Sequence, residues 1–413
     1  MLFNVLILFC LIFSFPLPAV GNSLLLSLVI ATPKVLLSSK RRKYFYSIIC
    51  NKYVLTIITL AFLLSILSFF YVILLGTYDF EKSYSLLSQI LTYFIASIVL
   101  SSLYNYERDY SYICKCIIIV FLIQSLIQII AFLSPEIRNF IKLFQFPGDT
   151  LVAEYYGGIR GLSVSGRLFF ELAASYGLIF FLYLKYFYDN NIYTYKYVFG
   201  FILIFIGSFF VGRTSIIAFG IALIFFLFYT GNRRTKLKII VKIIFSLLLL
   251  GLIIFFFLPG NIKDILLNKL LPWVFELVYK YFETGHAQSN SLDTLESMYS
   301  IDITDKEWII GSGIYTNPDG TYYKFTDSGY LRQILFWGLL GSFLNFVYML
   351  SFFYYPIKNN LKNKNELLFL GILLIYILIL HYKGELMGHS RFFLSLLFIY
   401  LVKYNEKWRL KRK

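Results

Sequence analysis

Apolar residues occur in runs of about 20 along almost the whole chain, separated by shorter polar connectors. A run of that length can cross about 30 Å of hydrocarbon as a helix. No alternation of apolar and polar residues long enough for a membrane barrel interrupts the runs. The pattern predicts an all-α, polytopic membrane protein with about 12 spans. We expect the spans at residues 2–18, 20–38, 53–75, 84–103, 113–133, 168–184, 197–212, 214–230, 239–258, 328–354, 367–381 and 392–403.

Pro16 and Pro18 interrupt the first two runs, which could instead form one tilted helix and leave 11 spans. We interpret residues 2–15 as a retained helix, because they lack the basic start and cleavage site of a signal peptide. No repeat or separate soluble domain is evident. The sequence therefore predicts a single membrane domain over residues 1–413.

Two connectors, residues 134–167 and 259–327, are much longer than the others. Lysine and arginine gather instead in short connectors, which the positive-inside rule places in the cytoplasm. Both long connectors then become outer, periplasmic loops. Within the second loop, residues 261–280 carry leucines at helical spacing, so we expect a helix lying along the membrane surface. The basic connectors are residues 40–43, 233–238, 358–364 and 403–413.

Composition supports a membrane protein and removes other classes. Apolar residues make up 59% of 413 positions, above the roughly 45–50% of soluble domains. The net charge of +16 could suggest nucleic acid, but the basic connectors account for most of it. Four cysteines without paired spacing and three scattered histidines indicate neither a disulfide framework nor a metal site.

Arginines on the predicted outer side are candidates for binding phosphate, because the guanidinium fork binds phosphate oxygens bidentately and stays charged. Arg160 follows two glycines that permit close backbone approach to a ligand. Arg213 lies in a tight turn between two apolar runs, where a charge is costly. Arg332 and Arg167 complete the set. The alternative is that such arginines only reach lipid headgroups or pair with local carboxylates.

Acidic and histidine side chains supply candidate bases. Asp327 begins the helix after the second loop, so it could cap that helix, act as a base, or do both. His286 could be a base or phosphate partner, although a lone histidine in a loop is usually only solvated. Glu171 follows Arg167 by four residues, a spacing that also suits a simple ion pair at a helix end.

Tyrosines in glycine-rich outer segments could stack on sugar rings. An interfacial aromatic belt is the alternative for each of them. The candidates are Tyr156, Tyr315, Tyr323 and Tyr330.

Three segments resemble the Wzy-type O-antigen polymerases of Gram-negative bacteria. The first is Tyr156-Gly-Gly-Ile-Arg-Gly-Leu-Ser-Val-Ser-Gly-Arg167, and the second is the turn Gly212-Arg-Thr-Ser215. The third runs from Gly311-Ser-Gly-Ile-Tyr315 through Thr326-Asp-Ser-Gly-Tyr-Leu-Arg332 to Gly338-Leu-Leu-Gly341. The predicted topology is similar over essentially the full length. Ser312 departs from the pattern, since similar polymerases often have an aspartate after the first glycine of this block.

The resemblance implies a metal-independent, cofactor-free glycosyltransferase. Such an enzyme joins oligosaccharide repeat units carried on undecaprenyl pyrophosphate at the periplasmic face of the inner membrane. It implies that Arg160, Arg213 and Arg332 bind the pyrophosphate, and that Asp327 stands where related O-antigen ligases carry a histidine. A chain-length regulator and a flippase would be partners in the same pathway. The alternatives are an O-antigen ligase and a lipid-linked oligosaccharide flippase or other transporter.

Overall fold

The computed structural model describes residues 1–18, 21–104, 110–155, 160–192, 194–229, 231–257, 259–286 and 289–404. Nearly all of the regular structure in these residues is helical, which confirms the all-α prediction. A helix forms in each of the apolar runs, with ends that differ from the predicted ones by a few residues. The two short strands, β1 (Pro16–Leu17) and β2 (Gly21–Asn22), pair antiparallel between the first two helices.

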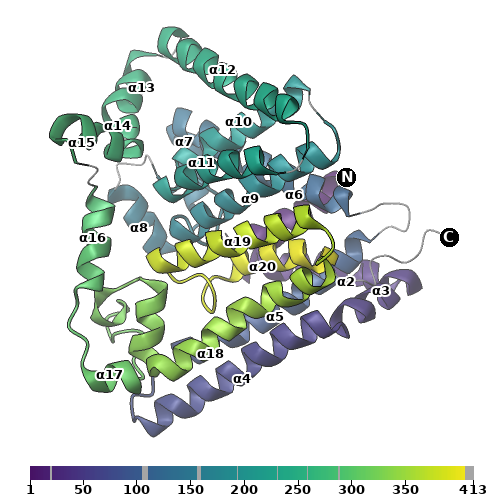
Figure 1. The fold of residues 1–413 in the computed structure, drawn as a ribbon, viewed down its shortest axis with the longest axis vertical. Helices are drawn as coiled ribbons and strands as arrows, with labels where there is room; N and C mark the ends of the chain where they lie inside the picture. The colour runs from purple at the N-terminus through teal and green to yellow at the C-terminus, as the bar shows by residue number, and fades with distance from the viewer. Residues whose placement is uncertain are drawn as a thin grey trace. The chain divides into compact units, whose positions relative to one another are not determined.

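The chain divides into two compact units, and each takes residues from both halves of the sequence (Figure 1). Unit 1 combines Met1–Leu26 with Glu107–Asn290, and unit 2 combines Ser27–Tyr106 with Ser291–Lys413. The sequence analysis, which indicates a single membrane domain, does not predict this division.

Unit 1 is built around α6, α9, α10 and α11. Helix α9 packs against α11 and α6, while α10 packs against α6, and α1 also packs on α6. Its elements are α1 (Leu2–Phe13), α6 (Ser111–Leu133), α7 (Pro135–Lys142), α8 (Pro147–Tyr155), α9 (Phe170–Asp189), α10 (Tyr195–Phe209), α11 (Arg213–Phe228), α12 (Arg233–Phe257), α13 (Gly260–Ile265), the π-helical turn η1 (Leu266–Leu270), α14 (Leu271–Val274) and α15 (Glu276–Thr284).

Unit 2 is built around α4, α5 and α18. Helix α5 packs against α4, α3 and α20, and α18 packs against α4, α17 and α19. Its elements are α3 (Ser39–Ile49), α4 (Lys52–Leu74), α5 (Glu81–Leu103), α17 (Asp305–Ile309), η2 (Tyr323–Phe325), α18 (Gly329–Asn359), α19 (Lys364–Lys383), α20 (Arg391–Leu401) and η3 (Val402–Tyr404); α2 (Ser23–Leu36) and α16 (Asn290–Tyr299) run across the divisions between the units.

Among the described residues, six helices are long and apolar enough to cross a membrane, namely α4, α5, α6, α9, α18 and α19. Helices α2 and α3 form a pair bent by 118°, which makes a seventh span if the pair is counted as one. Helices α1, α10 and α11 are apolar but shorter. The chain is thus a membrane protein by length and composition of its helices, and the finer count of 11 or 12 spans stays a prediction.

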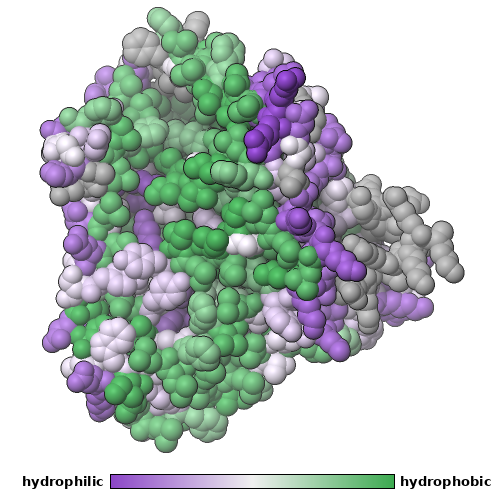
Figure 2. Space-filling model, in the orientation of Figure 1, coloured by the Kyte–Doolittle hydropathy of each residue, from purple (hydrophilic) through white to green (hydrophobic). Residues whose placement is uncertain are grey.

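Several of these helices keep large apolar side chains on the molecular surface. Figure 2 shows apolar residues over the visible parts of α4 and α12. On α12, Val241, Phe245 and Leu248 are exposed, and on α4, Phe62 and Phe70 are. Apolar surfaces of this kind are expected to contact lipid tails in a membrane.

The segment 261–280 is helical as predicted, but it is not one straight surface helix. It is divided among α13, η1, α14 and the start of α15. Leu270 and Val274 are buried in an apolar cluster with residues of α6, α7 and α10. The expected single helix is therefore corrected to a broken helical segment with two residues in the apolar core, and its place along the membrane surface stays a prediction.

A break in α18 explains the glycine pattern of residues 311–341. Gly338 has φ 68° and ψ −170°, which are not helical backbone angles. The break leaves the carbonyls of Leu335 and Phe336 without their usual hydrogen bonds within the helix. The backbone amides of Ser312 and Gly313 donate to these two carbonyls at 2.6 and 3.1 Å. The glycine-rich block therefore closes the break in the helix.

Candidate functional site

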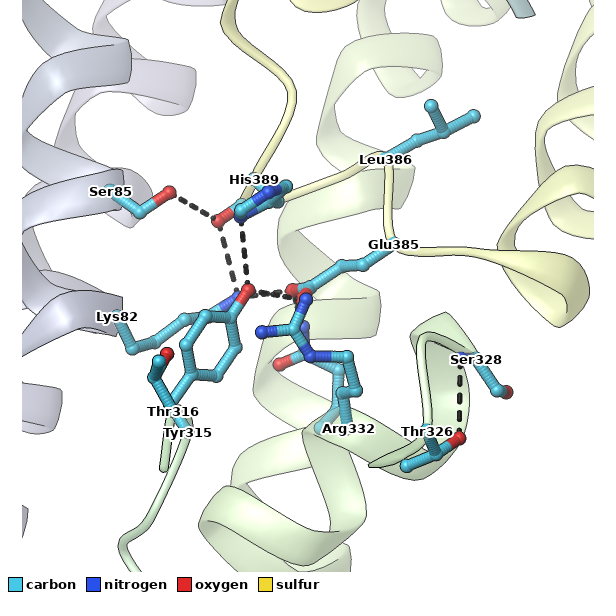
Figure 3. A network of polar contacts seen from close by, with 12 residues as sticks. Lys82, Ser85, Tyr315, Thr316, Thr326, Ser328, Arg332, Glu385, Leu386 and His389 are labelled. Carbon is cyan, nitrogen blue, oxygen red and sulfur yellow. Dashed lines mark hydrogen bonds and ion pairs between the residues drawn. The ribbon is translucent and has the colours of Figure 1, made fainter. Parts of the chain in front are cut away.

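The most connected polar cluster of unit 2 centres on Glu385, which is 4% exposed (Figure 3). Its carboxylate accepts hydrogen bonds from Lys82, the Tyr315 hydroxyl and the Gln333 amide. Nη1 of Arg332 lies 3.4 Å from the same carboxylate. Two cations therefore share one buried carboxylate, and extra hydrogen bonds satisfy its oxygens.

Four separate segments deliver these side chains. Lys82 lies in the first turn of α5, Arg332 and Gln333 lie near the start of α18, and Glu385 lies in the loop after α19. Asp79, just before α5, fixes the fourth segment by accepting from the amides of Tyr315 and Thr316 at 2.6 and 2.7 Å. The glycine-rich segment is held against α18 because its backbone amides bind the carbonyls exposed at the Gly338 break.

Arg332 is 4% exposed and lies between two aromatic rings. Its guanidinium carbon is 3.8 Å from the ring centre of Tyr315 and 3.7 Å from that of Tyr322. Within the part of the chain that the structure describes, Nε and Nη2 of this guanidinium have no hydrogen-bond acceptor. Stacking between the two rings holds the Arg332 guanidinium in place. A bound anion could accept hydrogen bonds from its Nε and Nη2 groups.

The charges of this cluster act on one another strongly. Burial alone would raise the pKa of Glu385, but the charges of Lys82 and Arg332 outweigh it and lower that pKa to about 2. Burial raises the pKa of the Tyr315 hydroxyl well above its usual value. At neutral pH, Glu385 is thus an anion that only accepts hydrogen bonds, and Tyr315 keeps its proton.

His389 and Asp327 are titratable groups beside this cluster. Nδ1 of the half-buried His389 is 3.1 Å from the Tyr315 hydroxyl. Asp327 is exposed. Partial desolvation by the surrounding protein raises the pKa of its carboxyl, and the charges of Lys383 and Arg332 offset part of that rise. The capping interpretation of Asp327 is wrong, because α18 begins at Gly329 and Ser328 occupies its N-cap.

Unit 1 holds a second cationic cluster, in which Arg160 and Arg213 share Trp273. Their guanidinium carbons lie 4.7 and 4.9 Å from the indole ring. Arg160 also lies 4.9 Å from the ring of Phe169 and donates from Nε and Nη2 to the carbonyl of Val211 at 3.3 and 3.0 Å. Two arginines separated in sequence by helices α9 and α10 thus converge on one aromatic side chain.

Arg213 is the first residue of α11, so the positive end of the helix dipole adds to its charge. It forms an ion pair with Glu276, whose carboxylate also lies 3.4 Å from Lys280. Burial opposes ionisation of Glu276, but the Asn290 amide and Arg213 together lower the pKa of its carboxyl. Glu276 is therefore the anion that occupies this cluster within the protein.

A pocket of about 270 Å³ adjoins Arg160 on the first predicted outer loop. Arg138 and Lys142 on α7 line it together with Glu154 on α8, and Lys142 and Glu154 pair at 2.8 Å. The charges of these lining residues are mostly positive. Gln145 fixes one wall by donating to the carbonyls of Gly161 and Ser163 at 2.6 and 2.8 Å.

Other predicted site residues lie in plainer surroundings. Arg167 is exposed and its Nε is 3.6 Å from Glu171, the helix-end ion pair that the spacing suggests. His286 is exposed, and its hydrogen bonds in the described residues use only its backbone, to Thr284. Tyr156 lies outside the described residues.

The tyrosines expected to line a glycan groove are differently placed. Tyr315 is 2% exposed and its ring faces Arg332. Tyr323 is half-buried, and its hydroxyl donates to Glu307 at 2.9 Å. The hydroxyl of Tyr330 donates to the carbonyl of Leu378 at 3.0 Å. Tyr322, which the sequence analysis does not select, is the more exposed partner of Arg332.

Sequence reasoning missed the centre of each cluster. Glu385 and Lys82 stand 303 positions apart, and neither lies in a recognisable motif. Trp273 and Glu276 fall within a predicted amphipathic segment, where they look like ordinary surface residues. One signal could have indicated Lys82 and Glu385, namely the free-energy cost of placing a charged side chain beside an apolar run.

No protein-family model, curated protein or solved structure matches this chain.

Proposed function

We propose that this chain polymerises oligosaccharide repeat units carried on undecaprenyl pyrophosphate, at the periplasmic face of the bacterial inner membrane. The observation that carries the proposal is the convergence of Arg160 and Arg213 on Trp273. Like charges brought together in this way repel each other, and a nearby anion offsets that repulsion. Glu276 supplies one negative charge, and a pyrophosphate would supply two or more.

The chemistry of the proposed reaction fits such a cluster. The leaving group is a lipid pyrophosphate, so the main demand is to stabilise negative charge as the sugar–oxygen bond breaks. Arginines held by stacking and by a backbone carbonyl are preorganised for that task. The proposal includes Arg332 and Arg167 as further phosphate ligands, Asp327 or His286 as the base, and aromatic side chains as glycan contacts.

The proposed topology has 11 or 12 spans, with residues 134–167 and 259–327 in the periplasm. Both contain residues of the cluster in unit 1, namely Arg160 in the first and Trp273 in the second. This orientation puts the arginines at the level of lipid headgroups, where the pyrophosphate of an undecaprenyl carrier lies.

The test is polymer formation by purified chain in vesicles, with a synthetic undecaprenyl-pyrophosphate-linked repeat unit as the only substrate. We expect a ladder of products from the wild type and at least a roughly 100-fold loss in Arg160→Ala and Arg213→Ala. Lysine at either position should restore only part of the rate, because it cannot bind bidentately. Arg391→Gln, which removes an exposed arginine at the start of α20, is the matched control.

Deletion of the gene separates this function from its alternatives. A polymerase mutant leaves one repeat unit on the lipopolysaccharide core, whereas a ligase or flippase mutant leaves none. The buried Lys82–Glu385 pair is an arrangement also found in transporters, and it keeps the flippase as second candidate. A product ladder from the purified chain would exclude a chain that only transports.

A further inference from the structure

A pocket of about 440 Å³ lies in unit 2, where α4 begins and α18 ends. These two helices pack side by side (Figure 1). Lys358 of the basic connector 358–364 and Tyr404 of the basic connector 403–413 both line the pocket. It therefore lies on the side of the membrane that the positive-inside rule predicts to be cytoplasmic.

The charged side chains that line this pocket are both lysines. Lys52 is the first residue of α4, and Lys358 lies in the last turn of α18. None of the described lining residues is acidic, and neither lysine has an ion-pair partner in the part of the chain that the structure describes. The positive end of the α4 dipole adds to the charge of Lys52. Two cations without a compensating carboxylate favour an anionic ligand.

An exposed apolar stripe continues from the pocket along α4. It consists of four residues that follow Lys52 at the spacing of one helix face, namely Leu55, Phe62, Ile66 and Phe69. A soluble anion would make no use of this stripe. The acyl chains of a lipid would cover it while the headgroup occupied the pocket.

We propose that this pocket binds the headgroup of an anionic phospholipid from the cytoplasmic leaflet, with the acyl chains along α4. Basic pockets between transmembrane helices on the cytoplasmic side bind such headgroups. The two lysines match the two phosphodiester charges of cardiolipin better than the single charge of phosphatidylglycerol. The site is independent of the proposed glycosyl transfer and joins the ends of two helices of unit 2 through one ligand.

Cys50 provides a reporter inside the pocket, because it is exposed and belongs to the lining. In the full chain with Cys114→Ser, Cys50 is the native cysteine that is not buried. Its labelling by a maleimide is followed by mass spectrometry in neutral-detergent micelles while cardiolipin is added. We expect cardiolipin to slow the labelling several-fold, and phosphatidylcholine at the same concentration to leave it unchanged.

Substitution of the lysines tests the charge of the site. Each lysine near an anionic headgroup contributes roughly fivefold in affinity, so Lys52→Gln with Lys358→Gln should raise the half-protecting cardiolipin concentration roughly 30-fold. Lys362→Gln with Lys364→Gln is the matched control. It removes two exposed lysines that follow α18 and do not line the pocket. The melting temperature without lipid should be the same in both double variants.

Three results would overturn the proposal. Equal protection of Cys50 by phosphatidylcholine, or unchanged protection by cardiolipin after loss of Lys52 and Lys358, would show that the lysines bind no headgroup. Equal protection by soluble glycerol phosphate would assign the pocket to a soluble anion instead of a lipid. An equally large effect in the control variant would mean that the charge of the whole region, and not this pocket, attracts the lipid.

Discussion

Trp273 is the residue on which the cluster of unit 1 depends, because its ring contacts two guanidinium groups at once. Each cation–π contact contributes about 0.5–2 kcal/mol, more when water is excluded. We expect Trp273→Leu to lower polymer formation about tenfold or more while the protein still inserts, since both arginines lose their shared support. Product per enzyme in vesicles is the measurement.

Trp308→Leu is the matched control for that substitution. Trp308 lies on α17, in unit 2, at 37% exposure. Equal losses in the two tryptophan variants would mean that Trp273 acts only through general packing.

Glu385 ties the stability of unit 2 to pH. Its folded-state pKa is lowered from 4.5 to about 2, so its stabilising effect is complete above the unfolded pKa and is lost as pH falls from 4.5 to about 2. We expect the melting temperature of the wild type to fall steeply over that acid range. Glu385→Gln should be less stable at neutral pH by about 3–5 kcal/mol, because two buried cations lose their carboxylate.

The same measurement contains its own check. Because the variant has no carboxyl at this position, its melting curve should change much less with acid than that of the wild type. Parallel pH profiles would show that other carboxylates control acid stability.

Sequence reasoning works at the residue scale where a side chain is costly in its own segment. Arg213 is selected for that reason and Arg160 for the glycines beside it, and the structure brings the two together. It could not select Glu385, because the partners of that carboxylate come from distant segments. Lys82 and Glu385 are 303 positions apart, so no periodic pattern in the sequence indicates that they pair.

At the scale of elements, the break in α18 is the feature with the clearest test. An added Cβ at Gly338 would lie 2.2 Å from the carbonyl oxygen of Ile309, and its φ of +68° already strains any other residue. At Gly311, an added Cβ would lie 2.5 Å from the carbonyl oxygen of Phe336. We expect Gly338→Ala and Gly311→Ala to lower the melting temperature and to loosen the Tyr315 segment, with turnover falling accordingly.

Gly371→Ala provides the comparison for both variants. An added Cβ at Gly371 meets nothing within 4 Å, and alanine favours the helix by about 1 kcal/mol. That variant should be as stable as the wild type or more so. A similar fall in all three would refute a special role for the break.

Helices were predictable because the apolar runs are long and the membrane allows few other structures. The break at Gly338 was not predictable, since periodicity continues through it; the backbone angles of Gly338 and the hydrogen bonds from residues 312 and 313 show it only in the structure. The division of residues 261–280 into several short helices was not predictable for the same reason, because their helical periodicity continues across the breaks.

For the whole molecule, the native cysteines offer a direct test of orientation. Cys50 is exposed between α3 and α4, next to a basic connector, whereas Cys10 and Cys116 are buried. Asp319, in the second long loop, is exposed. We expect a membrane-impermeant maleimide added to spheroplasts to label Asp319→Cys but to reach Cys50 only after lysis.

Cys50→Ser with Cys114→Ser removes the two native cysteines that are not buried and serves as the background for the introduced cysteine. Labelling of Cys50 before lysis, with Asp319→Cys protected, would place the clusters on the cytoplasmic side. That outcome would contradict the proposed substrate, whose repeat units are joined on the opposite face.

The pairing of Lys82 with Glu385 also bears on how the protein is made. Synthesis delivers Lys82 to the membrane some 300 residues before its carboxylate partner, so for most of that time the lysine of α5 has no such counter-ion. A helix with an uncompensated cation in its first turn can stay near the headgroups until the partner arrives. We therefore expect the final position of α5 in the membrane to be reached only after the loop that follows α19 has been made.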